Sequence, residues 1–107
     1  DEAHAALSAR MPEQTATAIV HGDYRLGNFL VDGEAGRVAA VLDWELCTLG
    51  DPVADFVWSI LYWSDPGDAT DFGSPSPTRH PAFPRRAEAI EMYARKSGLD
   101  LSQIDYY

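Results

Sequence analysis

The feature that most constrains the fold is a pair of short apolar runs on either side of a turn that contains two glycines. Residues 29–31 and 37–42 have strand character, and both glycines of the turn at 32–36 can adopt a positive φ. The pattern predicts an antiparallel β-hairpin. The residue before the first strand of a hairpin and the residue after the second lie at the same end. We therefore expect Asn28 and Asp43 to lie close together.

A polar motif leads directly into this predicted hairpin. It follows a partly β-branched run at 15–20, which we predict to be a strand, and it reads His21-Gly22-Asp23-Tyr24-Arg25-Leu26-Gly27-Asn28. Asp23, Asn28 and Asp43 then bring three oxygen-bearing side chains to one edge. Phosphoryl transfer requires such a set, because a carboxylate must receive the proton of the attacking hydroxyl and hard oxygen ligands must hold magnesium. Taken singly, each residue also has a purely structural interpretation as a turn or cap residue.

A predicted helix follows, with Asp51 as its N-cap, Pro52 as its first residue and an end near Trp63. Apolar residues cover most of its circumference, so we expect it to be buried on more than one side and to form the spine of the domain. Asp55 is the exception on that surface. An unpaired buried charge costs several kcal/mol, so we expect the carboxylate to bind backbone amides of the 21–28 loop. The nearby aromatics Trp58, Tyr62 and Trp63 are interpreted as core and rim residues.

The remaining segments give weaker signals. We predict helices at 2–10 and 85–97, the second capped by Gly98, and a plain connecting loop at 46–50. The core positions expected on the second helix are Ala87, Ile90, Met92, Tyr93 and Ala94. Residues 64–84 are too rich in Pro and Gly for regular structure, and we interpret them as a mobile surface loop or a substrate-side lid. Residues 100–105 carry caps for a further helix, and a chain that ends so soon afterwards is expected to be truncated.

Length and charge restrict the function further. A chain of 107 residues forms at most one small domain, here a single partial domain over 1–107, and a net charge of −9 argues against nucleic acid or an anionic membrane as partner. Cys47 is the only cysteine, so no internal disulfide forms, and we expect it to be a small buried residue. Without a leader or an apolar run of the ~20 residues that a membrane span needs, the expected location is the cytoplasm.

The pattern His-Gly-Asp-x-x-x-x-Asn at 21–28, followed by Asp43-Trp44-Glu45, resembles the catalytic and metal-binding loops of the aminoglycoside phosphotransferase family, which is related to the protein kinases. Within that family, the chain is most similar to the type linked with acyl-CoA dehydrogenases. The resemblance covers nearly the whole chain. It implies an α+β fold, namely a partial C-terminal lobe of a protein-kinase-like fold that is mostly helical and carries a catalytic-loop β-hairpin. In this family an Asp in the position of Asp55 ties down the catalytic loop.

The resemblance also implies an activity, the transfer of the γ-phosphate of ATP to a hydroxyl group of a small molecule. Asp23 would be the catalytic base, and Asn28 and Asp43 would hold Mg²⁺. His21 would pack and hydrogen-bond within the loop. Arg25 is expected to neutralise phosphate, to pair with Glu45 or to be a plain surface residue. Glu45 is expected to lie near the metal or in solvent. The residues that bind the acceptor, and hence its identity, are not indicated by the sequence.

Part of the family pattern has no counterpart in this chain. The family has an N-terminal nucleotide lobe with a phosphate-binding lysine, whereas the sole lysine here, Lys96, falls in a late predicted helix. We therefore expect this fragment to be inactive alone. Two other classes stay open. One is a non-catalytic, pseudokinase-like interaction module that self-associates through exposed apolar surface. The other is a metal-dependent phosphoesterase, which usually needs more ligands.

Overall fold

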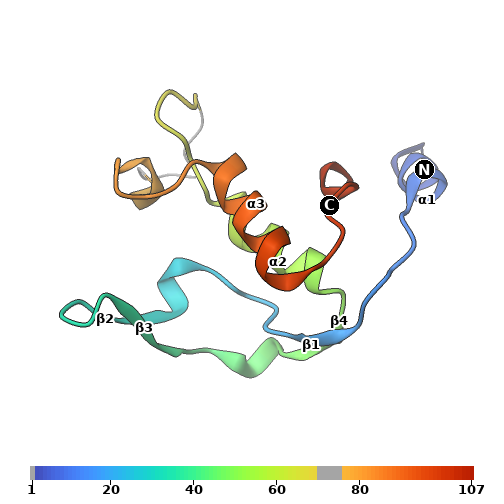
Figure 1. Cartoon of the computed structure of the whole chain (residues 1–107). Helices are drawn as coiled ribbons and strands as arrows, with labels where there is room; N and C mark the ends of the chain where they lie inside the picture. Colours follow the sequence, from blue (N-terminus) through green and yellow to red (C-terminus); the bar gives the residue numbers. More distant parts are fainter. Residues whose placement is uncertain (1, 70–75) are drawn as a thin grey trace.

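The structure is a computed structural model that describes residues 2–69 and 76–107. Figure 1 shows a two-stranded hairpin and a second small sheet on one side of two neighbouring helices, with a third helix standing apart near the N-terminus. In this part of the chain the helices and strands are α1 (Glu2–Arg10), β1 (Ala18–Val20), β2 (Phe29–Asp32), β3 (Arg37–Val41), β4 (Thr48–Gly50), α2 (Pro52–Leu61) and α3 (Arg86–Ser97). The predicted α+β class is confirmed.

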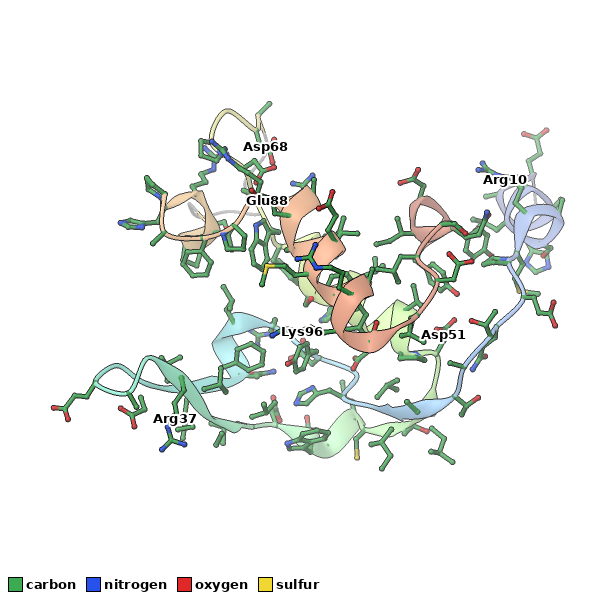
Figure 2. All side chains as sticks on the ribbon, in the orientation of Figure 1. Arg10, Arg37, Asp51, Asp68, Glu88 and Lys96 are labelled. Atoms are coloured by element: carbon green, nitrogen blue, oxygen red, sulfur yellow. The ribbon has the colours of Figure 1, made fainter. Side chains whose placement is uncertain are left out.

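The predicted hairpin is formed by β2 and β3. The strands are antiparallel, with Phe29 opposite Val41 and Asp32 opposite Arg37. Asp32 stabilises the turn because its Oδ1 accepts hydrogen bonds from the next backbone amides, including that of Glu34 at 3.2 Å. Arg37 projects from the hairpin on the side away from α2 and α3 (Figure 2). The open end of the hairpin, opposite its turn, is joined to the motif at 21–28, because β2 begins directly after Asn28.

The prediction of a plain loop at 46–50 is wrong. Within this segment β4 pairs with β1 in antiparallel register, with Val20 opposite Thr48 and Ala18 opposite Gly50. A three-residue strand gives little periodic signal, and its pairing partner lies far back in the sequence, so local pattern did not reveal it. This pairing places the start of α2 next to β1, which delivers the chain to His21.

Helix α2 is the spine of the described fold, but only one stripe of it is buried. The Asp51 side chain caps it by accepting a hydrogen bond from the amide of Val53 at 2.9 Å. Val53, Phe56 and Ile60 are its buried residues, and with Val20 they form the apolar core of the described residues. Leu61 is 47% exposed. The expectation of burial on more than one side was therefore wrong for this part of the chain.

Helix α3 packs on α2 mainly through one aromatic pair. The ring of Tyr93 stacks on Phe56, with centroids 3.8 Å apart. The helix ends at Gly98, whose φ of 70° confirms the predicted left-handed cap. No residue within this helix is fully buried, and Ala87 and Met92 are exposed, so they are not core positions. The other predicted core positions, Ile90, Tyr93 and Ala94, are half-buried.

Two further expectations are corrected. Cys47 is exposed rather than buried, because it lies on a surface where its neighbours Leu46 and Leu49 are also exposed. The segment 100–105 contributes only to a 3-10 turn at Ile104–Tyr106 rather than a full helix. Among the helices in the described part of the chain, none combines the length and apolarity needed to cross a bilayer.

Asp55 joins α2 to the polar motif. Its Oδ2 accepts a hydrogen bond from the backbone N–H of His21 at 2.8 Å, and its Oδ1 accepts one from the N–H of Gly22 at 2.9 Å. A carboxylate on a partly buried helix face is thereby satisfied by two backbone donors. The same two bonds fix where the motif leaves β1.

We predict that Asp55→Ala lowers the free energy of unfolding by about 2–3 kcal/mol, because the amides of His21 and Gly22 lose a charged acceptor. Urea denaturation followed by circular dichroism measures this loss. Glu91→Ala is the matched control, since Glu91 is exposed and its ion pair with Arg95 is exposed as well. The control should change stability by less than ~0.5 kcal/mol. Equal effects of the two substitutions would contradict the role assigned to Asp55.

Candidate catalytic and metal-binding loop

His21 fastens the beginning of the motif to the end of the hairpin. It is only 2% exposed, and its Nδ1 accepts a hydrogen bond from the N–H of Asp23 at 3.2 Å. The ring proton is therefore on Nε2, which donates to the carbonyl oxygen of Leu42 at 2.7 Å. The ring also lies against Trp44, with centroids 4.7 Å apart. His21 thus joins Asp23 of the motif to Leu42 and Trp44 at the end of the hairpin.

Gly22 allows the chain to turn between the strand and Asp23. Its φ is 86°, a left-handed conformation that side chains rarely adopt. A Cβ at this position would lie 2.8 Å from both the Cβ and the carbonyl oxygen of Leu46. Only glycine fits here, which explains the middle residue of the His-Gly-Asp sequence.

Asp23 is held by donors from three side chains. Trp58 Nε1 donates to Oδ1 at 2.9 Å, and Asn28 Nδ2 donates to Oδ2 at 2.9 Å. Arg25 Nε contacts both oxygens, at 3.2 and 3.1 Å. The hydrogen bond from Trp58, and then those from Asn28 and Arg25, lower the pKa of Asp23 below its ordinary value, although partial desolvation opposes them. The carboxylate is therefore ionised at neutral pH and able to accept a proton.

Asn28 lies between Asp23 and the hairpin. It is 7% exposed, and its Nδ2 also donates to the carbonyl oxygen of Asp23 at 2.9 Å. The backbone carbonyl oxygen of Asn28 accepts a hydrogen bond from the N–H of Leu42 at 2.8 Å. Both side-chain hydrogen bonds use the amide nitrogen, so the amide oxygen Oδ1 is the atom left to coordinate a ligand.

Asp43 follows Leu42 directly and therefore lies beside Asn28 at the open end of the hairpin. Its φ of 68° is unusual for a residue other than glycine. Such backbone conformations cost free energy and cluster at functional sites. The side chain is exposed, and the carboxylate of Asp43 and the amide oxygen of Asn28 are hard donors of the kind that Mg²⁺ prefers. The donor chemistry of these two residues is compatible with a magnesium ion, which would take its other ligands from water and phosphate.

Arg25 and Glu45 are the two remaining candidate site residues. Arg25 pairs with Asp23, not with Glu45, so that expected ion pair is wrong. Glu45 is exposed in the 3-10 turn at Trp44–Leu46. In the described ranges, His, Cys, Asp and Glu side chains form no group of three that suits a metal ion. Any metal here would depend on Asn28 and Asp43.

A cavity of about 500 Å³ opens beside Asp23. One wall consists of motif residues, including Asp23 and Arg25, and another of residues near the end of α2, including Tyr62 and Trp63. The third wall is the segment 76–78. A cavity of this size is sufficient for a small molecule next to the carboxylate.

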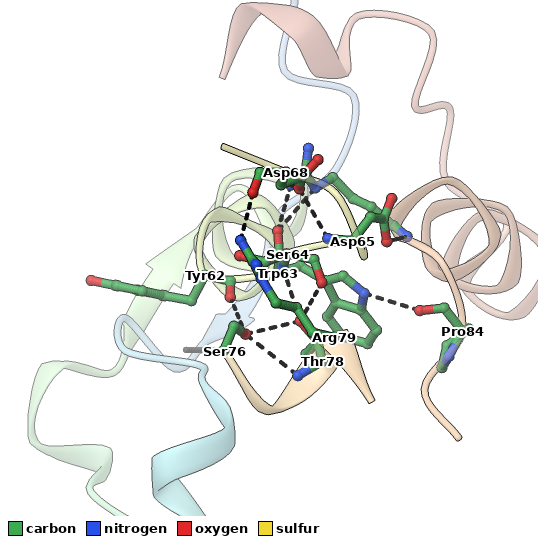
Figure 3. Close-up of polar contacts among 10 residues, drawn as sticks. Tyr62, Trp63, Ser64, Asp65, Asp68, Ser76, Thr78, Arg79 and Pro84 are labelled. Carbon is green, nitrogen blue, oxygen red and sulfur yellow. Dashed lines mark hydrogen bonds and ion pairs between the residues drawn. The ribbon is translucent and has the colours of Figure 1, made fainter. Parts of the chain in front are cut away.

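The wall at 76–78 is tied to the backbone just after α2 by a set of contacts that we call the clasp, in which the hydroxyls of Ser76 and Thr78 bind backbone groups of Tyr62 and Ser64 (Figure 3). Thr78 is 3% exposed, and its Oγ1 accepts from the N–H of Ser64 at 2.8 Å and donates to the Ser64 carbonyl at 3.0 Å. Ser76 Oγ donates to the carbonyl of Tyr62 at 2.8 Å. The clasp therefore holds the wall in place.

The prediction that 64–84 lacks regular structure is wrong in part, because Pro77–Arg79 forms a 3-10 turn. Side chains on both sides of the clasp reinforce it. Trp63 Nε1 donates to the carbonyl of Pro84 at 3.0 Å, and Arg86 pairs with Asp68 at 2.8 Å. The central residues of this segment, 70–75, lie outside the described ranges, so the proposed lid is not tested there.

Sequence reasoning missed the contact between Trp58 and Asp23. We interpreted Trp58 as a core or rim aromatic, but its indole donates to the candidate base. A signal was present, because residues three apart on a helix share a face. If Asp55 faces the motif, Trp58 must face it as well.

An ionised Asp held beside an Asn, with a second Asp at the end of a hairpin, is the loop arrangement of kinase-like phosphotransferases. The model of the phosphotransferase enzyme family (APH) matches residues 1–101, and the chain belongs to this family. The sequence-based assignment to that family is thereby confirmed.

Individual relatives agree with this assignment. A crystal structure of a candidate aminoglycoside phosphotransferase from Ralstonia eutropha JMP134 is 38% identical, with a TM-score of 0.68 over 86% of this chain and 29% of that one. Human acyl-CoA dehydrogenase family member 11 is 34% identical over 82 residues, which are 77% of this chain and 10% of that protein. Mouse family member 10 is 53% identical over 55 residues, 51% of this chain and 5% of that protein. The chain thus spans about a tenth or less of these two relatives.

The clasp gives a prediction about stability. In Thr78→Val the side-chain shape is nearly kept, but the N–H and carbonyl of Ser64 lose their partner. We expect a loss of about 2 kcal/mol in unfolding free energy, measured by urea denaturation. Thr15→Val is the matched control, because Thr15 is exposed, and it should stay within ~0.5 kcal/mol of the unmodified chain. A Thr78→Val chain as stable as the control would show that the clasp does not hold the wall.

Proposed function

We propose that this chain carries the catalytic and metal-binding loops of an ATP- and Mg²⁺-dependent phosphotransferase that acts on a hydroxyl group of a small molecule. The observation that carries the proposal is the Asp23 carboxylate, which is ionised and fixed by three side-chain donors at the wall of a 500 Å³ cavity. Membership of the phosphotransferase enzyme family supports it.

In this proposal Asp23 is the base. The acceptor hydroxyl enters the cavity, its oxygen forms a bond to the γ-phosphorus of ATP, and the bond from that phosphorus to the bridging oxygen of ADP breaks. The hydroxyl proton passes to a carboxylate oxygen of Asp23. A lowered pKa suits this task, since the transition state is loose and positioning matters more than basicity.

Asn28 and Asp43 would hold the magnesium ion, through Oδ1 of the amide and the carboxylate. The bound ion neutralises charge on the phosphates. Asn28 also donates to Asp23, so a single residue would relate the position of the metal to that of the base. Arg25, which already contacts Asp23, lies at the cavity wall where a transferred phosphate would be.

We further propose that these loops act together with a nucleotide-binding lobe outside the 107 residues. The sole lysine, Lys96, lies exposed on α3 and belongs to neither the motif nor the cavity wall. The chain also covers only 29% of the Ralstonia structure. The chain alone is therefore proposed to be inactive in phosphate transfer.

Calorimetry with Mg-ATP tests the metal site. A form extended at the N-terminus by a nucleotide lobe should bind, and the chain alone should not. Asp43→Ala should weaken binding by the extended form at least ~10-fold, because a hard oxygen ligand is lost. Glu34→Ala is the matched control, since Glu34 is an exposed acid at the hairpin turn. If neither form binds, the interaction module supported by exposed Ile19, Leu46 and Leu49 becomes the better proposal.

Replacement of the base tests the chemistry. Asp23→Asn in the extended form should reduce the rate of phosphate transfer by ~10²–10⁴-fold, because the amide cannot accept the proton and offers only one oxygen to orient the attacking hydroxyl. Affinity for Mg-ATP should stay nearly unchanged. The rate is measured as ADP formed in the presence of a hydroxyl acceptor, with Glu34→Gln as control. A retained rate in Asp23→Asn would refute the assignment of the base.

A further inference from the structure

Two residues one turn apart on α2 contact consecutive parts of the motif. Asp55 accepts hydrogen bonds from the backbone of His21 and Gly22, and Trp58 donates to the side chain of Asp23. Positions three apart on a helix lie on the same face. A single face of α2 therefore holds both the backbone of the motif and the carboxylate that follows it.

The Trp58 contact restrains one particular oxygen. Its indole Nε1 donates to Oδ1 of Asp23, whereas Asn28 donates to Oδ2. With one oxygen held from α2 and the other from the loop, the carboxylate cannot rotate without losing a hydrogen bond. Trp58 is itself restrained by Tyr62, whose ring meets it edge-on with centroids 5.8 Å apart.

The other two tryptophans of the chain make a different kind of contact. Trp44 Nε1 donates to the backbone carbonyl of Val41 at 2.8 Å, and Trp63 Nε1 donates to that of Pro84 at 3.0 Å. These bonds anchor loops. Within the described residues, Trp58 is the one tryptophan whose indole binds a carboxylate, and it is 40% exposed rather than buried.

We propose that Trp58 is a positioning residue for Asp23. Its indole N–H holds Oδ1 of Asp23, so that the carboxylate faces the cavity in one orientation. The proposal rests on the proposed function, because it is Asp23 as base that gives this orientation a purpose. Trp58 itself transfers no proton, since an indole N–H is a donor only. The hydrogen bond also favours the ionised form of Asp23, consistent with its lowered pKa.

NMR of the 107-residue chain at one neutral pH tests the contact without any assay of activity. Asp23→Asn should move the indole N–H signal of Trp58, because its acceptor changes from a charged to a neutral group. The indole signals of Trp44 and Trp63 should stay in place, since their acceptors are backbone carbonyls. In Trp58→Phe the carboxyl carbon signal of Asp23 should move, whereas the matched controls Trp44→Phe and Trp63→Phe should leave it unchanged.

Other polar groups near Asp23 must be separated in this experiment. Arg25 pairs with the Asp23 carboxylate, and His21 accepts from the Asp23 amide rather than from its carboxylate. Asp55 binds the neighbouring amides of His21 and Gly22. Residue-resolved carboxyl signals distinguish Asp23 from Asp55, so a response of Asp55 rather than Asp23 to Trp58→Phe would overturn the proposal.

A kinetic measurement separates positioning from folding. In the extended form, Trp58→Phe should lower kcat by about 10-fold while KM for Mg-ATP stays the same, because only the orientation of the base is disturbed. A Trp58 signal insensitive to Asp23→Asn, or an unchanged Asp23 carboxyl signal in Trp58→Phe, would overturn this proposal whether or not phosphate is transferred. Absence of transfer with both signal changes present would instead refute the proposed function. If Trp58→Phe fails to fold, the response of the Trp58 signal to Asp23→Asn still decides.

Discussion

The hydrogen bonds from two backbone amides to Asp55 are the interaction on which the rest of the described structure depends. Helix α2 contributes Val53, Phe56 and Ile60 to the core, so a charge one residue away from this stripe requires partners. The amides of His21 and Gly22 supply them. Because these amides begin the motif, the requirement to satisfy one carboxylate also determines where the motif lies relative to the helix.

From that junction the contacts continue to the hairpin through Leu42. Its carbonyl accepts from His21, and its N–H donates to the carbonyl of Asn28. One residue of the chain thus joins the beginning of the motif to its end, and Asp43 follows immediately. The backbone of the motif and the start of Asp43 therefore take their positions from hydrogen bonds to backbone groups, whereas the Asp23 carboxylate is fixed by side-chain donors.

How much of this the sequence could predict depended on the range of the interactions. The hairpin at 29–42 and the neighbourhood of Asn28 and Asp43 followed from turn residues, which act locally. The strand Thr48–Gly50 did not, because it forms only by pairing with a distant segment. Cys47 was misjudged for a related reason, since burial depends on which elements cover a surface and not on the residue itself. Helical spacing from Asp55 was enough to predict Trp58 at the site, but residue type alone favoured the core.

The donors around Asp23 pose a chemical question, since hydrogen bonds that lower the pKa of a carboxylate also weaken it as a base. In a loose phosphoryl-transfer transition state the hydroxyl proton leaves late, so basicity contributes little. Orientation contributes more, because the attacking oxygen must lie in line with the bond that breaks. Three donors from α2 and the loop fix the carboxylate at the expense of basicity. The arrangement therefore suits a residue that directs a hydroxyl group better than one that must remove its proton early.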